Sequence, residues 1–197
     1  MKKVADSQVI MHELVLPNDT NILGNILGGR VMHYMDICAA MSAYKHARTP
    51  VATASVDNLD FLAPAKMGEI ICLKSSVNYS HNSSMEVGVH IDAENVKTGK
   101  RRHTASAYLT FVSLDPNGKP QKVNDIIAES DDEKRRYNEG KERHLERIQS
   151  SAVSEIRLIG LRKRKSLLGK FFSYTDEEEK KLGRKLDKSP INNLFSN

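Results

Sequence analysis

The chain has 197 residues, a formal net charge of +5, 39% hydrophobic residues and a mean hydropathy of −0.49. No apolar run reaches the roughly 18 residues of a membrane-spanning helix, and we expect no signal peptide before the first strand-like segment. Residues 1–130 hold 13 Lys and Arg against 13 Asp and Glu, so the excess positive charge belongs to residues 131–197. The basic balance therefore does not indicate a nucleic-acid partner for the front of the chain.

The first elements are a short strand and a long apolar helix. Residues 8–16 are strand-like and end at Pro17, and a polar, glycine-containing loop follows. From residue 31 to residue 43 the apolar positions follow i, i+4, i+7, i+8 spacing, which predicts a helix from Gly28 that stops before Pro50. The other side of this helix is apolar too, so we expect a central, buried helix.

Four further strands are predicted at residues 53–62, 68–79, 85–93 and 103–114, joined by short turns. In the third of them apolar residues alternate with Glu86, Gly88, His90 and Asp92, which indicates one solvated face. Short links imply antiparallel neighbours. The sequence thus predicts an α+β fold, with a curved antiparallel five-stranded sheet wrapped around one long central helix.

The C-terminal third has a different composition. Residues 119–149 read as a linker and a charged helix, which the capping box Ser130-Asp131-Asp132-Glu133 begins at about residue 130 and which ends near residue 148. Residues 150–197 read as a basic, weakly structured tail. Within it, residues 156–172 mix leucine and phenylalanine with lysine and arginine, which suits a flexible tail or packing arm, or weak contact with an anionic membrane surface. No aromatic platform for nucleic acid accompanies these charges.

The loop before the helix and one acid within it are the candidate site. Gly28 and Gly29 lie at the helix start and leave backbone N–H groups open to an anion, although they would equally allow close packing. Asp36 lies among apolar residues, where burial costs several kcal/mol unless the carboxylate is functional or paired with Arg30 or His33.

The unit that joins Asn21, Gly28-Gly29 and Asp36 resembles the hotdog-fold acyl-coenzyme A thioesterases. The similarity is greatest to the bacterial YciA-type and mammalian cytosolic brain-type acyl-CoA hydrolases. It continues through residues 57–61, Ser83-Ser84 and residues 107–111, and covers about residues 8–118. The resemblance implies a hotdog domain that hydrolyses fatty acyl-CoA to free acid and CoA. It also implies a homo-oligomer, with a dimer as the smallest unit and a trimer of dimers, a hexamer, as the full assembly.

Residue by residue, the resemblance makes Asn21 the catalytic asparagine and Asp36 the catalytic acid, as general base or nucleophile. Asparagine also suits a turn, so a purely structural role for Asn21 remains open. Asp57 is a candidate for the pantetheine channel or a surface acid, and Ser83 and Ser84 are candidates for CoA contact or ordinary turn residues. Relatives often carry an arginine where this chain has Asn82, which puts a phosphate contact at that turn in doubt.

Helix geometry adds a constraint on this site. Seven residues from Gly29 to Asp36 span about 10 Å at ~1.5 Å per residue, so both groups cannot contact one reacting carbon within the same chain. We therefore expect a composite site, in which the glycine amides and Asn21 of one subunit face Asp36 of another. A hydratase or dehydratase using His33 and Asp36, or a non-catalytic acyl-CoA binder, are the alternatives.

Cofactors and metals are not expected. Cys38 and Cys72 fall within predicted core segments without a Cys-x-x-Cys pair, which favours core roles over a Cys38 nucleophile and suits a reducing compartment such as the cytoplasm. The seven histidines share no ligand spacing with each other or with the cysteines, so the sequence predicts no metal site. CoA enters only as part of the substrate.

Overall fold

The computed structural model describes residues 1–158. Residues 1–140 form one compact unit, and a second unit begins at Lys141. The elements in chain order are β1 (Lys2–Lys3), α1 (Val4–Ser7), β2 (Val9–Leu14), a 3-10 turn (Pro17–Asp19), α2 (Gly28–Ala47), β3 (Val51–Phe61), β4 (Ile70–His81), β5 (Ser84–Glu94), β6 (Arg101–Ser113), β7 (Ile126–Ile127) and α3 (Asp131–Leu158).

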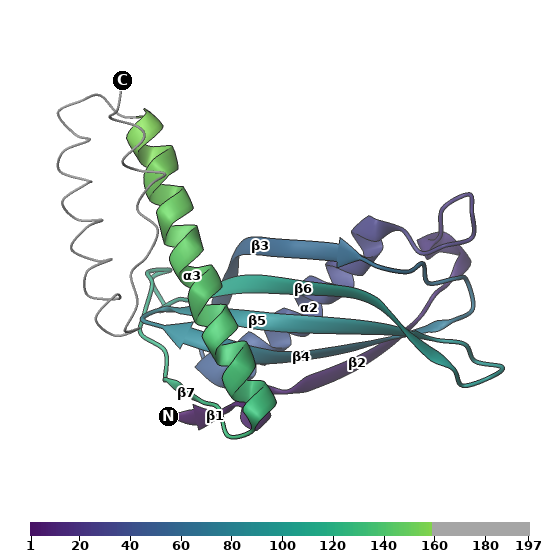
Figure 1. The fold of residues 1–197 in the computed structure, drawn as a ribbon, viewed down its shortest axis with the longest axis horizontal. Helices are drawn as coiled ribbons and strands as arrows, with labels where there is room; N and C mark the ends of the chain where they lie inside the picture. The colour runs from purple at the N-terminus through teal and green to yellow at the C-terminus, as the bar shows by residue number, and fades with distance from the viewer. Residues whose placement is uncertain (159–197) are drawn as a thin grey trace. The chain divides into compact units, whose positions relative to one another are not determined.

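Five strands form one antiparallel sheet in the order β2-β4-β5-β6-β3. The long helix α2 lies against one face of this sheet (Figure 1). This arrangement confirms the predicted five-stranded α+β architecture. The edge strand β3 has two register irregularities against β6, between Thr53 and Ser55 and between Asp57 and Leu59.

The core lies between α2 and the inner face of the sheet. Buried residues of α2 such as Val31, Met35 and Ala39 belong to one cluster with Val87 and Phe111 of the sheet. The helix is central, as predicted, but it is not buried around its whole circumference. The sheet covers one face only, and the opposite face exposes apolar side chains, which are Met32, Ile37, Met41 and Tyr44.

The outer face of the sheet is less solvated than the alternation of β5 predicts. Glu86 is 1% exposed, because the first turns of α3 lie over it. Tyr137 of α3 packs edge-on against Tyr79, with ring centroids 5.2 Å apart. A Cβ on Gly140 would lie 2.8 Å from Glu86 Oε1 and 3.1 Å from Tyr79 Cβ, so a larger residue here would displace the Glu86 side chain. The predicted wet face is therefore wrong at Glu86.

The start of α3 agrees with the predicted capping box. Ser130 Oγ accepts a hydrogen bond from the Glu133 amide, and Glu133 Oε2 accepts one from the Ser130 amide. The helix then continues to Leu158, past the predicted end near residue 148. Residues 150–158 are accordingly helical rather than weakly structured. The rest of the tail, including all but the start of the 156–172 segment, lies outside the described residues.

Two N-terminal elements have no counterpart in the sequence prediction. β1 pairs in parallel with β7, and α1 follows directly. Ser7 Oγ of α1 accepts a hydrogen bond from the Val77 amide of β4, and Ser80 Oγ of β4 accepts one from the Ile126 amide of β7. In the described part of the chain, no helix is both long and apolar enough to cross a membrane.

Candidate active site

The loop that precedes α2 is held to the first turn of the helix by Asp19. Arg30 Nε lies 2.7 Å from Asp19 Oδ1, and the Leu27 amide donates to the Asp19 carbonyl at 2.8 Å. Asp19 is 5% exposed, so this carboxylate is buried but paired. Arg30 therefore pairs with Asp19, and the alternative pairing of Arg30 with Asp36 does not occur.

Asn21 organises the turn that follows. Its Oδ1 accepts hydrogen bonds from the amides of Leu23 at 2.9 Å and Asn25 at 3.2 Å, which defines the orientation of the carboxamide. Its Nδ2 has no hydrogen-bond partner among the described residues, and the side chain is exposed. Asn21 is thus a turn residue through its oxygen and retains an open N–H donor.

The adjacent glycines begin α2 with exposed backbone. The N-cap residue Leu27 supplies no side-chain cap, so the first N–H groups of the helix lack an internal partner. A Cβ on Gly29 would meet nothing within 4 Å, and one on Gly28 would make ordinary contact with Phe61 at 3.5 Å. Close packing within the chain therefore does not require glycine at either position.

These residues border a cleft of about 330 Å³ at the C-terminal end of β3. Its walls are mostly apolar and include one carboxamide and the start of α2. The lining residues are Asn21, Asn25, Ile26, Gly28, Val31, Phe61, Leu62, Ala63, Pro64, Ala65 and Thr104. Such a combination of apolar walls and a few polar donors is typical of small-molecule sites.

Asp36 lies on the side of α2 next to the edge strand. It is partly exposed rather than enclosed by hydrocarbon, so the prediction of a buried acid was wrong. Thr53 Oγ1 of β3 donates a 2.7 Å hydrogen bond to Asp36 Oδ1. No motif in the sequence pointed to Thr53, because its contact with Asp36 depends on how β3 lies beside the helix.

The cleft and the Asp36–Thr53 pair are separated within one chain. Gly28 and Asp36 are eight residues apart on α2, which is about 12 Å along the axis. Thr53 and Phe61 are eight residues apart on β3, which is about 26 Å in an extended strand. The structure therefore brings Asn21 and Gly28 together at one place and Asp36 with Thr53 at another.

The remaining candidates lie away from the cleft. Asp57 on β3 accepts a hydrogen bond from Ser55 Oγ at 3.2 Å. The β4–β5 turn with Ser83 and Ser84 lies beside the C-terminal end of β6, which pairs with the first residue of β3. Ser84 Oγ donates to a backbone carbonyl within this turn. These serines are thus nearer the Asp36 end of β3 than the cleft end.

Cys38 has the environment of a core residue. It is fully buried, and its Sγ lies 3.2 Å from Ser75 Oγ. Burial raises the pKa of the Cys38 thiol, which disfavours the thiolate that a nucleophile needs. This environment supports the expectation that Cys38 is structural.

Comparison with known proteins identifies the family. Residues 23–100 match the family model described as the thioesterase superfamily. The chain is 40% identical over 142 residues to the uncharacterized acyl-CoA thioester hydrolase YkhA of Bacillus subtilis, covering 72% of this chain and 83% of that protein. The chain belongs to the hotdog-fold acyl-CoA thioesterase family. It is also 39% identical over 145 residues to the mouse cytosolic acyl coenzyme A thioester hydrolase, of which the match spans only 38%.

Solved structures of the family have the same fold. An apo-hexameric acyl-CoA thioesterase superimposes with a TM-score of 0.73 at 38% identity, covering 77% of this chain and 98% of the other. The acyl-CoA hydrolase of Staphylococcus aureus, in complex with butyryl coenzyme A and coenzyme A, gives a TM-score of 0.72 at 38% identity over 80% of this chain and 99% of the other.

The S. aureus hydrolase has also been solved as three single alanine variants, of an asparagine, an aspartate and a threonine. In that enzyme the asparagine precedes the aspartate by 15 residues, and the threonine follows it by 17. Asn21, Asp36 and Thr53 have the same spacing in this chain. The residue types changed in that enzyme thus recur at the same spacing in this chain, where Asn21 lies at the cleft and Asp36 with Thr53 lies apart from it.

Proposed function

We propose that this protein hydrolyses acyl-CoA thioesters to the free acid and CoA at a site shared by two subunits. Asp36, hydrogen-bonded by Thr53, supplies the base or nucleophile from one subunit. The partner's Asn21 and the first-turn amides of its α2 supply the donors. The observation that carries this proposal is that both half-sites are open to solvent yet lie at opposite ends of β3 in one chain.

The edge strand offers a route by which the half-sites meet. β3 has a neighbour on one side only, so its other edge carries unpaired backbone groups. Antiparallel pairing of β3 with a second copy would set the N-terminal half of each strand beside the C-terminal half of the other. Thr53 and Asp36 would then lie near the partner's cleft.

The exposed apolar surface beside this edge supports such an interface. Met32, Ile37 and Met41 on α2, Val56 on β3 and the tip of the Asn21 loop are all solvent-accessible in the single chain. Exposed apolar side chains on two elements that meet at this edge favour a protein–protein contact there. We propose a homo-oligomer with the dimer as its smallest active unit and a trimer of dimers as the full assembly, as hexameric relatives suggest.

The chemistry follows from the two half-sites. Asp36 acts in one of two ways. As a general base it removes a proton from a water molecule while that water attacks the thioester carbon. As a nucleophile its carboxylate attacks the carbon directly, and water then hydrolyses the acyl-enzyme intermediate. The carbonyl oxygen gains negative charge in either case, and the partner's Asn21 Nδ2 with the amides of the partner's Gly28 and Gly29 would donate to it. The CoA thiolate leaves and takes up a proton. CoA is part of the substrate, and we propose no separate cofactor.

CoA contacts are assigned to the Asp36 side of the site. Ser83 and Ser84 lie at the end of the sheet where β3 begins, and Asp57 lies further along the same strand. We assign Asp57 to the pantetheine path and the two serines to the nucleotide end. The buried, unpaired cysteines Cys38 and Cys72 suit a cytoplasmic protein. Membrane contact through residues 156–172 stays a prediction.

Subunit complementation tests the shared site. Asp36→Asn and Asn21→Ala should each lower turnover by at least about 100-fold, the scale of an acid–base group, with the oligomer intact. After unfolding and refolding the two variants together, half of the dimers are mixed and each has one intact site, so about a quarter of the parent activity should return. Release of thiol from acyl-CoA substrates of increasing chain length is the measurement.

The controls separate the shared site from other outcomes. The Asp36→Asn, Asn21→Ala double variant, mixed with itself, should stay inactive. Full subunit exchange without recovered activity would place both residues in one chain's own site. Water addition to an enoyl-CoA without thiol release would indicate a hydratase, and tight acyl-CoA binding without turnover would indicate a binding protein.

A further inference from the structure

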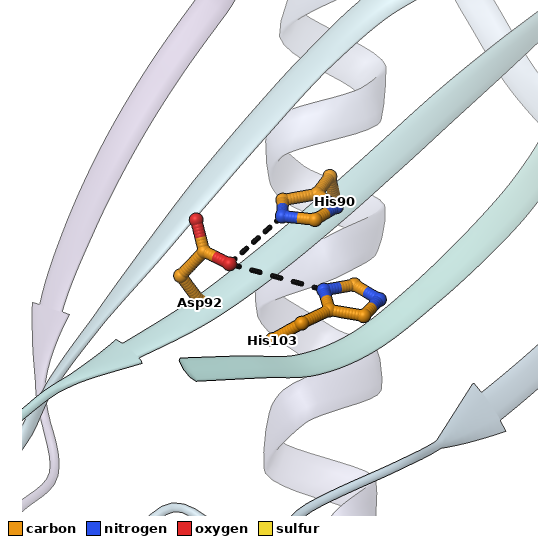
Figure 2. Close-up of side chains that lie close together, drawn as sticks. All are labelled: His90, Asp92 and His103. Atoms are coloured by element: carbon orange, nitrogen blue, oxygen red, sulfur yellow. Dashed lines mark hydrogen bonds and ion pairs between the residues drawn. The ribbon is translucent and has the colours of Figure 1, made fainter. Parts of the chain in front are cut away.

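A cluster of potential ligand atoms lies on the outer face of the sheet, on the opposite side from α2 (Figure 2). His90 and Asp92 are two residues apart on β5, so their side chains share one face. The register of the sheet pairs Asp92 with His103 of β6. The two strands therefore bring two imidazoles and one carboxylate to a single point.

The three side chains converge closely. His90 Nε2 lies 2.8 Å from Asp92 Oδ1, and His103 Nδ1 lies 3.8 Å from the same oxygen. The two imidazole rings stack with centroids 4.1 Å apart and planes 11° apart. One ligand atom from each residue falls within 4.8 Å of the other two.

A hydrogen bond with Ser106 orients the ring of His103. Its Nε2 lies 3.0 Å from Ser106 Oγ, while its Nδ1 is buried and has no hydrogen-bond partner. If Nε2 carries the proton and donates to Ser106, the unpaired Nδ1 presents a lone pair toward Asp92 and His90. An outer hydrogen bond that fixes the tautomer of a ligating histidine is the usual arrangement in metal sites.

The Asp92 carboxylate has one oxygen near Lys74 and the other, Oδ1, facing the two histidines. Lys74 Nζ approaches Asp92 Oδ2 at 3.6 Å. Asp92 is 14% exposed, whereas His90 is 45% exposed and leaves the cluster accessible from solvent. The site is thus shielded on the Lys74 side and open on the His90 side.

We propose that His90, Asp92 and His103 bind one divalent transition-metal ion, for which Zn²⁺ is the representative. Zinc takes histidine nitrogen and carboxylate oxygen at about 2.0–2.2 Å, which sets tetrahedral ligand atoms about 3.3–3.6 Å apart. Because the two imidazole planes lie 11° apart in a stack, binding requires the rings to rotate out of the stack until both nitrogen lone pairs point at one ion. Two nitrogen ligands disfavour Ca²⁺ and Mg²⁺, which prefer oxygen. Three protein ligands leave a fourth position for water.

The sequence did not predict this site. The expectation of no metal rested on spacing along the chain, and His103 lies on a different strand from His90 and Asp92. Strand register, rather than sequence distance, sets the ligand geometry. The proposal is independent of thioester hydrolysis, because the cluster lies on the outer face of the sheet and the proposed catalytic groups lie along α2 and the edge strand.

Calorimetric titration with Zn²⁺ tests the site on the full-length oligomer after treatment with a chelator. The parent should bind one Zn²⁺ per chain. His90→Ala, His103→Ala and Asp92→Asn should each weaken binding by at least about tenfold, since losing even an outer partner of a ligand costs about 10–100-fold. His12→Ala removes an exposed histidine of β2 outside the cluster and should bind as the parent does.

A second variant keeps the test valid if a ligand variant folds poorly. Ser106→Ala retains all three ligands and removes only the partner of His103, so it should weaken Zn²⁺ binding by about tenfold. Absence of a one-to-one site in the parent would overturn the proposal. Equal Zn²⁺ binding by the parent and by the three ligand variants would overturn it as well, because the ion would then be held elsewhere.

Discussion

Thr53 donates a hydrogen bond to Asp36 and so links the edge strand to the helix at the carboxylate. If Asp36 acts on the thioester, this hydroxyl holds its oxygen in place. Thr53→Ala should lower kcat by about 10–100-fold with little change in KM, the usual cost of a misplaced catalytic group. Thr53→Ser keeps the hydroxyl and should recover most of the activity. Parent-like kcat in Thr53→Ala, measured by thiol release, would contradict this role.

Glu69 holds the segment that forms one wall of the cleft. Its carboxylate accepts hydrogen bonds from Arg102 and from the Lys66 amide, and Arg102 also donates to the carbonyl of Pro64. The hydrogen bond from Arg102 is the main cause that lowers the pKa of Glu69 below its ordinary value. The ion pair therefore stabilises the fold above the pKa of a free glutamate, about 4.3, and is lost as pH falls through the lower folded pKa.

The corresponding variant should show this pH dependence. Glu69→Gln should lower the free energy of unfolding by about 1.5–3 kcal/mol at pH 7, the range for hydrogen bonds to charged groups. The difference from the parent should shrink below about pH 4. Urea unfolding at pH 7 and at pH 3.5 measures both values. An equal difference at the two pH values would show that charge on Glu69 is not the cause.

At the level of elements, the C-terminal end of α2 depends on a buried histidine. His46 is fully buried, and its Nε2 donates to the Asn124 carbonyl at 2.7 Å. Burial lowers the pKa of His46, so the folded state favours the neutral ring. The unfolded chain then binds more protons below its own histidine pKa of about 6.5. Stability should therefore fall as pH drops from about 6.5 toward the folded pKa.

A matched variant isolates this histidine. His46→Gln keeps a donor for the Asn124 carbonyl but does not titrate, so its stability should depend less on pH between 7.5 and 5.5. Calorimetric melting across this range gives the two slopes. Parallel slopes for parent and variant would assign the pH dependence to other groups.

The elements also show what the sequence could predict. The bounds of α2 were predicted closely from the glycine pair, the 3.6-residue spacing and Pro50. The alternation of apolar residues in β5 identified the core face of that strand. The two-residue strands β1 and β7 were not predicted, because so short a segment shows no alternation of apolar and polar residues. The burial of Glu86 was not predicted, because the helix that covers it, α3, is distant in sequence.

The candidate site was predicted in part. Gly28-Gly29 and Asp36 were selected from residue type and position, and Asn21 was assigned from the family resemblance. The distance along the helix already separated the glycines from Asp36. The exposure of Asp36 was not predicted. An apolar helix face gives the same sequence pattern whether it packs within its own chain or against another chain. Thr53 and the pairing of Asp92 with His103 depend on strand register, which alternation of apolar residues does not define.

For the whole molecule, the open edge of β3 is the expected interface. Val56→Glu would place a charge on the exposed apolar surface of β3 and should reduce the oligomer mass, with thiol release falling at least about tenfold. Ile10→Glu is the matched control, since Ile10 is exposed on the opposite edge strand β2 and should change neither quantity. Light scattering gives the mass. A Val56→Glu protein with parent mass would move the interface elsewhere.

The two edges of the sheet are unequal. β2 has six residues beside the twelve of β4, and the uncovered part of β4 bonds instead to Ser7 and to the Ile126 amide. At the other edge, β3 extends for eleven residues. If β3 pairs with a second copy of the chain, having one long accessible edge and one short one would stop sheet extension at two copies. The unequal edges would then also oppose growth of the sheet into fibres.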